Sequence, residues 1–213
     1  MFRKFSLSLL IMKQKLKIIF ATGNKGKLRE AAEILGDGFE LVSPASLGIT
    51  EDIEETGETL EENSVIKAEY LYRRTGMNCF ADDTGLEVDA LGGAPGVHSA
   101  RYATEGHDFN ANMDKLLFEL SKHPGEPRTA RFRSVVTLII GGEKHFFVGS
   151  LEGSIATVKA GTQGFGYDPV FIPDQYPGHT VAELGEDVKN EISHRGKALR
   201  EMAAWMKDNG YGE

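Results

Sequence analysis

The sequence predicts a single α/β protein with a mixed β-sheet, arranged as two lobes around a cleft. Near its start, the strand-like run LKIIFAT (16–22) is followed by a glycine turn and then by a run with helical periodicity, which is how an α/β unit begins. The middle of the chain holds β-branched and aromatic runs joined by Gly141-Gly142, a dipeptide typical of a tight antiparallel hairpin. Because the middle is antiparallel and the ends are helical, the sheet should be mixed.

In the first part of the chain, helices and strands alternate. The run LREAAEIL (28–35) places its apolar residues on one helical face. A short strand is expected at 39–43. Thr59 and Glu62 have the spacing of a capping box, so a long helix should start there and run to about Arg74.

In the second part, the pattern changes twice. NCFADD (78–83) is expected to be a strand that ends at two aspartates, and 108–123 reads as an amphipathic helix. The runs 129–140 and 143–158 are expected to be the strands of the hairpin. A last helix should begin after Ser193, a residue type that favours the N-cap.

Composition limits the kinds of ligand. The chain has 213 residues and a formal net charge of −8, which argues against nonspecific binding to duplex nucleic acid. A polyanionic ligand would therefore need local cations or a metal. The single cysteine, Cys79, lies in a strand-like run and is interpreted as a small core residue in a chain suited to a reducing compartment.

The N-terminus only weakly resembles a signal peptide. Basic residues precede the apolar run FSLSLLIM, but no small-residue cleavage site follows, and Met12 is an equally good start. We therefore interpret residues 1–15 as an extension, residues 16–213 as one domain, and the protein as cytoplasmic. No run approaches the roughly 18 apolar residues that a membrane span requires.

Two clusters are candidates for a phosphate and metal site. A glycine turn before a helix directs backbone N–H groups and the helix dipole to one point, where phosphate binds readily; an ordinary turn with solvated lysines is the alternative. This cluster is Thr22, Gly23, Asn24, Lys25, Gly26 and Lys27. The adjacent carboxylates of Asp82 and Asp83 repel each other, so they should share a proton or a cation such as Mg²⁺, unless they are a solvated turn. Glu54 or Glu55 could complete a metal site, or form an ordinary acidic loop.

Two later clusters are candidates for binding a base. The first is a glycine-rich loop in which Phe165 could stack on a planar base, although buried aromatics in a strand connection are equally compatible with its composition. It continues with Gly166, Tyr167 and Asp168. The second gathers hydrogen-bond donors around a helix start, with solvated basic residues as the alternative: Lys189, His194 and Arg195.

Together, these motifs resemble the inosine triphosphate pyrophosphatase family. The segments that carry the resemblance are TGNKGKLRE, EETGETLEENSVIKA, FADDTGLEVDALGGAPGVHSARY, GTQGFGYDPVF and ISHRGKAL, in this order from residue 16 to the C-terminus. The resemblance implies an elongated mixed sheet with helices, two lobes around a substrate cleft, and a homodimer. It also implies Mg²⁺-dependent hydrolysis of ITP, dITP or XTP to the monophosphate and pyrophosphate.

The resemblance also implies roles for individual residues. Asp83 would accept a proton and bind metal with Glu54, and Lys67 would contact phosphate. Thr84, which stands where the family often has serine, would contact the substrate. The glycine turn would bind phosphate and the two later clusters the nucleoside. Gln163 replaces a frequent glycine, which could alter the flexibility of its loop.

Two other functions remain open at this level. A related pyrophosphatase acting on modified pyrimidine nucleotides would show a similar architecture, and a nucleotide-binding module without turnover would show the same turn. The acids at Glu54 and Asp83 favour an enzyme.

Overall fold

One mixed sheet of seven strands organises the protein. The computed structural model describes residues 15–212, without the side chains of residues 186, 187 and 190. The strands are β1 (Leu16–Phe20), β2 (Phe39–Val42), β3 (Cys79–Val88), β4 (Pro95–Gly96), β5 (Thr129–Ile140), β6 (Glu143–Ile155) and β7 (Phe171–Pro173). Their order is β2-β1-β3-β5-β6-β7, with β4 paired to β3, and only the β1–β2 and β1–β3 pairs are parallel. The predicted mixed α/β class is confirmed. The expected N-terminal extension, residues 1–15, lies outside the described part except for its last residue.

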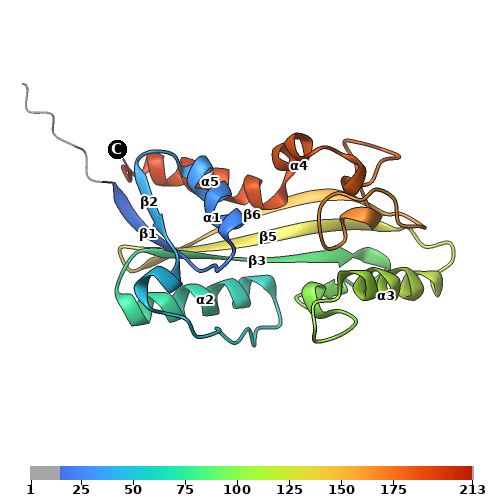
Figure 1. The fold of residues 1–213 in the computed structure, drawn as a ribbon, viewed down its shortest axis with the longest axis horizontal. Coiled ribbons are helices and arrows are strands. Elements are labelled where there is room, and N and C mark those ends of the chain that lie inside the picture. Colours follow the sequence, from blue (N-terminus) through green and yellow to red (C-terminus); the bar gives the residue numbers. More distant parts are fainter. Residues whose placement is uncertain (1–14, 213) are drawn as a thin grey trace, which may run out of the picture.

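Helices cover both faces of this sheet. They are α1 (Lys25–Leu35), α2 (Leu60–Thr75), α3 (Phe109–Ser121), α4 (Glu186–Ile192) and α5 (His194–Asp208). Figure 1 shows α1 and α5 on one face and α2 on the other at the end of the sheet that holds β1 and β2, with α3 and α4 toward the opposite end. Between residues 15 and 212, no helix is both long enough and apolar enough to cross a membrane.

The structure confirms most of the elements that were predicted from local sequence signals. The Thr59–Glu62 capping box forms at the start of α2, and Ser193 caps α5 by accepting from the Gly196 N–H. Gly141 and Gly142 have φ angles of 58° and 87°, the left-handed values that a two-residue hairpin turn needs and glycine adopts at little cost. The short elements α4 and β7 were not predicted, because so few residues show no clear period.

The prediction that the strand ends at Asp83 is wrong, because β3 continues to Val88. Its whole length pairs with β5, where Asp82 lies opposite Val136 and Asp83 opposite Val135. The pairing with β1 involves only the first two residues of β3. The two aspartates therefore lie within a strand, just beyond the carboxyl end of its parallel neighbour.

The apolar core is divided between the two ends of the long strands. Beneath α1 and α5, Phe20 and Phe80 stack with ring centroids 4.3 Å apart. Beneath α2, Leu71 packs with Cys79, whose pKa burial raises to about 12, so the thiol is a core group as expected. A third cluster, which includes Leu116 of α3, fills the opposite end. The middle of β3 lies between these clusters.

The start of α5 lies directly against β6. A Cβ added at Gly149 would overlap the carbonyl oxygen of His194 and lie 2.7 Å from the backbone nitrogen of Ala198. Glycine is therefore required here for close approach of the two backbones, and this contact positions the first residues of α5.

We expect Gly149→Ala to lower the free energy of unfolding by about 1–3 kcal/mol, since overpacking must push α5 away from the sheet. The matched control is Gly185→Ala, because Gly185 has no atom within 4 Å of an added Cβ and no left-handed φ. Urea denaturation of both variants measures the effect, and equal midpoints would contradict it.

Candidate functional site

The turn between β1 and α1 is held by its own side chains. The Asn24 side chain accepts hydrogen bonds from the backbone N–H groups of Gly26 (2.8 Å) and Lys27 (3.1 Å), so it caps α1. Thr22 Oγ1 accepts from the Asn24 N–H at 3.1 Å. Gly23 has no atom within 4 Å of an added Cβ, and Lys25 is exposed. The turn thus presents an open backbone and an exposed cation at the positive end of a helix dipole.

Asp82 is the anionic centre of an ion cluster on the face covered by α1 and α5. The residue is 2% exposed, and its carboxylate accepts hydrogen bonds from Lys27 Nζ at 2.9 and 3.1 Å and from Arg195 Nε at 2.9 Å. Burial opposes ionisation, but the charges of Lys27 and Arg195 outweigh it and lower the pKa of Asp82. Arg195 also approaches Glu30 of α1 at 3.5 Å. Asp82 therefore joins β3 to both helices.

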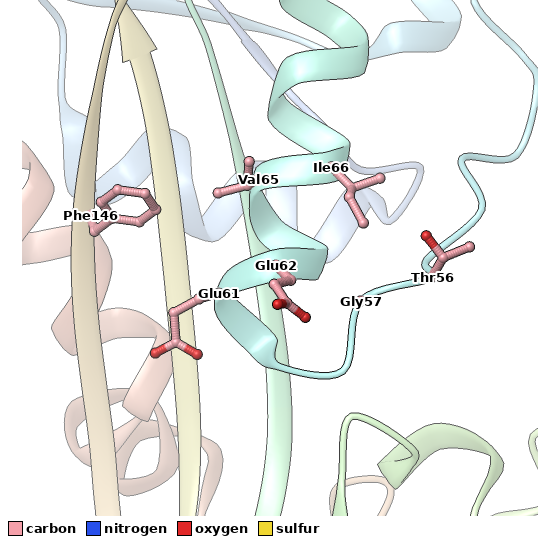
Figure 2. A pocket seen from close by; sticks show the side chains of 7 residues that line it. All are labelled: Thr56, Gly57, Glu61, Glu62, Val65, Ile66 and Phe146. Carbon is pink, nitrogen blue, oxygen red and sulfur yellow. The ribbon is translucent and has the colours of Figure 1, made fainter.

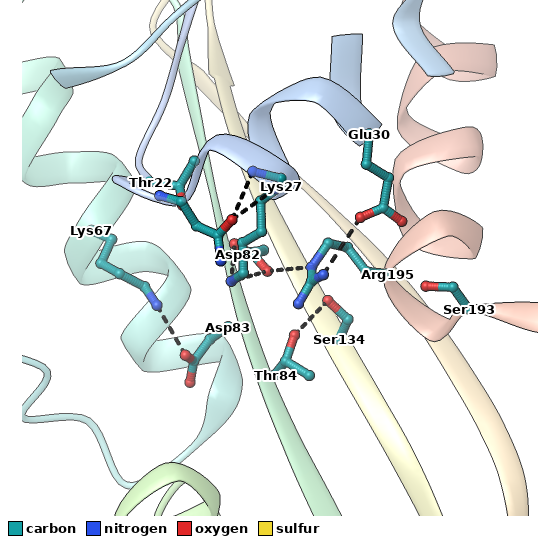
Figure 3. Close-up of polar contacts among 12 residues, drawn as sticks. Thr22, Lys27, Glu30, Lys67, Asp82, Asp83, Thr84, Ser134, Ser193 and Arg195 are labelled. Carbon is teal, nitrogen blue, oxygen red and sulfur yellow. Dashed lines mark hydrogen bonds and ion pairs between the residues drawn. The ribbon is translucent and has the colours of Figure 1, made fainter. Parts of the chain in front are cut away.

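Asp83 faces the other side of the sheet, where its partner is Lys67 of α2. Lys67 Nζ donates to Asp83 at 2.9 Å and to Glu55 at 3.2 Å (Figure 3 shows the first bond). Burial raises the pKa of Asp83 to about 6; Lys67 opposes this shift, and the charges of Glu55 and Asp82 add to it. Burial lowers the pKa of Lys67, but the charges of these acids outweigh it, so its pKa is raised and it stays cationic. Asp83 thus takes up a proton more readily than an ordinary aspartate.

Strand alternation explains why two neighbouring aspartates behave differently. Successive side chains of a strand point to opposite faces, so Asp82 and Asp83 do not share one cation as an isolated pair would. Thr84 returns to the face of Asp82, and its hydroxyl donates to the buried Ser134 of β5 at 3.0 Å. Neither aspartate lies in a solvated turn, and that alternative is wrong.

The glycine-rich loop combines an exposed ring with buried supports. Phe165 is 61% exposed, and its N–H donates to the Asp168 carboxylate at 2.9 Å. Lys189 binds the same carboxylate and places its ammonium 4.4 Å from the Phe165 ring centroid. Tyr167 is buried, and its hydroxyl donates to the Ser99 carbonyl at 2.9 Å. The alternative of buried aromatics is therefore confirmed for Tyr167 and wrong for Phe165, and the stacking of a base on Phe165 stays a prediction.

His194 is neutral in this environment. Its ring stacks on Phe132 with centroids 5.1 Å apart, and Nδ1 is enclosed without a hydrogen-bond partner. Burial, together with the charge of Arg195, lowers the pKa of His194 to about 3. His194 Nδ1 is enclosed and the Arg195 side chain is 13% exposed, so the alternative of solvated basic residues is wrong for these two.

Glu54 lies apart from this cluster. It lines an open hollow beside α2, together with Tyr70 and Arg74, whereas its neighbour Glu55 is the acid bound to Lys67. A second hollow, of about 610 Å³, lies on the same helix (Figure 2). The residues that line it are Thr56, Gly57, Glu61, Glu62, Val65, Ile66 and Phe146.

The structure therefore brings two of the predicted phosphate-binding residues, and one residue of the predicted nucleoside-binding cluster, to the aspartates of β3. Lys27, Lys67 and Arg195 reach them from three helices (Figure 3). Sequence reasoning missed Ser134 and Glu30. The first is recognisable only from strand register, and the second only from the packing of α1 against α5.

Comparison with known proteins gives the same picture. The model of the Ham1 family matches residues 18–205. The chain is similar to the dITP/XTP pyrophosphatase of Porphyromonas gingivalis, with 53% identity over 89% of this chain and 97% of that protein. It is 48% identical to the enzyme of the same name from Bacillus subtilis, over 93% of this chain and 100% of that protein. The family resemblance drawn from the five motifs is confirmed.

Solved structures share the fold. A HAM1 protein from Coxiella burnetii superposes with a TM-score of 0.85 and 37% identity, covering 91% of this chain and 99% of that one. A nucleoside-triphosphatase / dITP/XTP pyrophosphatase from Mycobacterium abscessus gives a TM-score of 0.76 and 44% identity, covering 87% and 98%.

The two aspartates should respond oppositely to amidation. Asp82→Asn removes the buried anion that Lys27 and Arg195 share, and we expect it to lower the free energy of unfolding by about 3 kcal/mol or more at pH 7. Asp83→Asn removes a charge whose ionisation is already disfavoured, so its stability should equal that of the wild type or exceed it by up to about 2 kcal/mol. Denaturant unfolding in EDTA compares the two variants, each serving as the other's control.

The effect at Asp83 should depend on pH. A carboxyl with a raised folded pKa contributes stability that is present below its unfolded value and lost as the pH rises through about 6. The advantage of Asp83→Asn should therefore be absent at about pH 4 and complete above pH 6. An advantage that stays constant across this range would argue against a raised pKa.

Proposed function

The chain belongs to the Ham1 family, and we propose that it hydrolyses ITP, dITP and XTP to the nucleoside monophosphate and pyrophosphate, which removes non-standard purines from the nucleotide pool. The observation that carries the proposal is the convergence of Lys27, Lys67 and Arg195 on adjacent aspartates, beside an open glycine turn. Such an arrangement can position a triphosphate and stabilise the charge that develops on leaving pyrophosphate.

The charge balance of this cluster favours a bound cation. Its three cationic side chains face four carboxylates: Glu30, Glu55, Asp82 and Asp83. The cluster alone therefore has no surplus positive charge for a triphosphate. We propose that Mg²⁺ binds with the substrate and supplies it, because Mg²⁺ commonly uses one or two carboxylates together with phosphate oxygens and water.

The residues around Lys67 fit such an ion. Asp83 and Glu55 both lie within hydrogen-bond distance of Lys67 Nζ, so two hard oxygen donors are already held near one point. Among the side chains described between residues 15 and 212, no three of His, Cys, Asp or Glu form a metal cage of their own, which agrees with an ion that relies on phosphate and water. When bound, Mg²⁺ would offset phosphate charge. Geometry favours Glu55 over the predicted Glu54.

Asp83 is our proposed proton acceptor. Its raised pKa of about 6 makes it a stronger base than an ordinary aspartate at neutral pH, and Lys67 fixes its orientation. In this proposal it takes the proton of the water that attacks the α-phosphate. Asp82, with its lowered pKa, holds Lys27 and Arg195 in place.

Base selectivity is proposed to come from the face of the site that carries Phe165. A purine ring would stack on the exposed Phe165, and its 6-keto oxygen would accept from donors on this face such as Lys189. Adenine would direct an amino donor to these donors and leave enclosed groups unsatisfied. Such mismatches discriminate by about 10⁴ in sites built around one hydrogen bond. The homodimer implied by the resemblance and the cytoplasmic location inferred from the sequence remain predictions.

We expect pyrophosphate release from ITP, XTP and dITP with Mg²⁺, with kcat/KM at least about 100-fold above that for ATP, because one enclosed hydrogen-bond mismatch suffices for this ratio. UTP and TTP complete the panel. The absence of pyrophosphate from all three purine substrates would refute the proposal, and a preference for UTP or TTP would indicate a pyrimidine enzyme.

Loss of the proposed base should affect chemistry rather than folding. Asp83→Asn is expected to lower kcat about 100-fold or more while the thermal midpoint is retained, in line with removal of a general base. Stopped assays of pyrophosphate measure kcat. Turnover at the wild-type rate would exclude Asp83 as the proton acceptor.

Variants of Glu54 and Glu55 test which of the two binds the metal. Glu55→Gln should raise the Mg²⁺ concentration needed for half-maximal rate about tenfold, because it removes one of two carboxylate ligands. Glu54→Gln is the matched control and should leave it unchanged. The reverse result would indicate that Glu54 is the metal ligand.

A further inference from the structure

Phe109 and Phe165 form an exposed aromatic pair. Phe109 opens α3 and is 44% exposed, while Phe165 in the glycine-rich loop is 61% exposed. Their ring centroids lie 6.5 Å apart, with the planes inclined at 49°. Two large apolar rings from distant segments are thus held next to each other in water.

The exposure of Phe109 is unusual for its place in the helix. Phe109 precedes Met113 by one turn and belongs to the same helical face, which continues with Leu116 and Leu120. Met113 is only 5% exposed and the two leucines are buried. The helix therefore inserts this face into the core, except for its first ring, which extends beyond the core toward Phe165.

Contacts on both sides hold the two rings in register. Lys159, which precedes the glycine-rich loop, forms an ion pair with Asp114 of α3 at 2.6 Å and approaches the Asn110 carbonyl at 3.5 Å. These bonds tie the first turns of α3 to the chain that leads to Phe165.

A second link passes through the short helix η3 (Ser99–Arg101). Tyr167 donates its hydroxyl to the Ser99 carbonyl, and the buried Asn112 of α3 donates to the Ala100 carbonyl at 3.0 Å. The loop with Phe165 and the helix with Phe109 are therefore anchored to the same three-residue segment. The spacing of the rings is a property of the folded structure rather than of two free loops.

The two rings contact each other, since a centroid distance of 6.5 Å is within the range of an ordinary aromatic pair, and a base enters between them only when they turn to face each other. Two rings that hold a base between them lie about 7 Å apart, twice the contact distance of about 3.5 Å between carbon atoms. An exposed side chain reorients within nanoseconds, so the Phe109 ring can turn from its inclined position to become parallel. The Lys189 ammonium lies over the Phe165 ring, so this wall is also cationic.

We propose that Phe109 is a further base-binding residue, which closes over the purine that stacks on Phe165. The inference rests on the proposed function, since it assigns the second wall of the same nucleoside site. It adds a contact that recognises the flat surface of the base and makes none with the phosphates.

The test is Phe109→Ala, with Phe118→Ala as the matched control. Phe118 lies on the same helix and is likewise exposed, at 61%, but its ring is covered by Lys122 instead of an aromatic partner. We expect Phe109→Ala to raise KM for ITP about tenfold with kcat within about twofold, as for the loss of one base-stacking contact. Phe118→Ala should change neither constant.

Two further measurements separate stacking from a structural role. The inhibition constant of pyrophosphate, which has no base, should be the same in Phe109→Ala and wild type, and Phe109→Trp should restore the KM. An unchanged KM in Phe109→Ala, or a pyrophosphate constant weakened as much as the KM, would overturn the inference.

Failure of the proposed reaction and failure of the proposed Phe109 contact can be told apart. Turnover of ITP by the wild type tests the function, and the ratio of variant to wild type tests the contact. If the wild type shows no turnover, calorimetric titration with ITP decides the contact: about tenfold weaker binding by Phe109→Ala supports it. Equal affinity, or no binding by either protein, overturns it.

Discussion

The alternation of side chains along β3 is the constraint on which the site depends. Because successive residues of a strand face opposite sides of the sheet, Asp82 points to α1 and α5 while Asp83 points to α2. Each carboxylate then meets a cation from the helix on its own side. Three helices are fixed to one short stretch of strand, and their cationic side chains are brought close to the β1–α1 turn.

The same alternation gives the two aspartates different chemistry. Asp82 has two cationic partners and a lowered pKa, so it is a permanent anion that holds the architecture together. Asp83 shares one lysine with Glu55, and burial raises its pKa to about 6. A carboxyl group with a raised pKa, next to one that stays ionised, has properties that suit a proton acceptor or a metal ligand. The division of structure and chemistry between neighbouring residues follows from the strand.

The residues proposed to bind the base are supported by a different part of the fold. Phe165, Tyr167 and Asp168 belong to a loop whose buried members are tied to η3 and to α4, at the end of the sheet where α3 packs. The groups proposed to bind phosphate and those proposed to bind the base are thus supported by different parts of the core. Arg195 and His194 connect the two, because they are neighbours at the start of α5 and Gly149 lets that start lie directly on β6.

The sequence by itself determined the features that depend on near neighbours. The change of hydrophobic period predicted the mixed sheet, Thr59 and Glu62 predicted the start of α2, and the glycine pair predicted the hairpin. Each of these features depends only on residues within one turn or one strand. Only the tertiary structure decided that β3 runs past Asp83, since β5 sets its length, and that Asp82 pairs with Arg195, 113 residues away. Contacts between residues far apart in the sequence produce no local periodic pattern. The ion-pair partners of each charged side chain are therefore visible only in the folded structure.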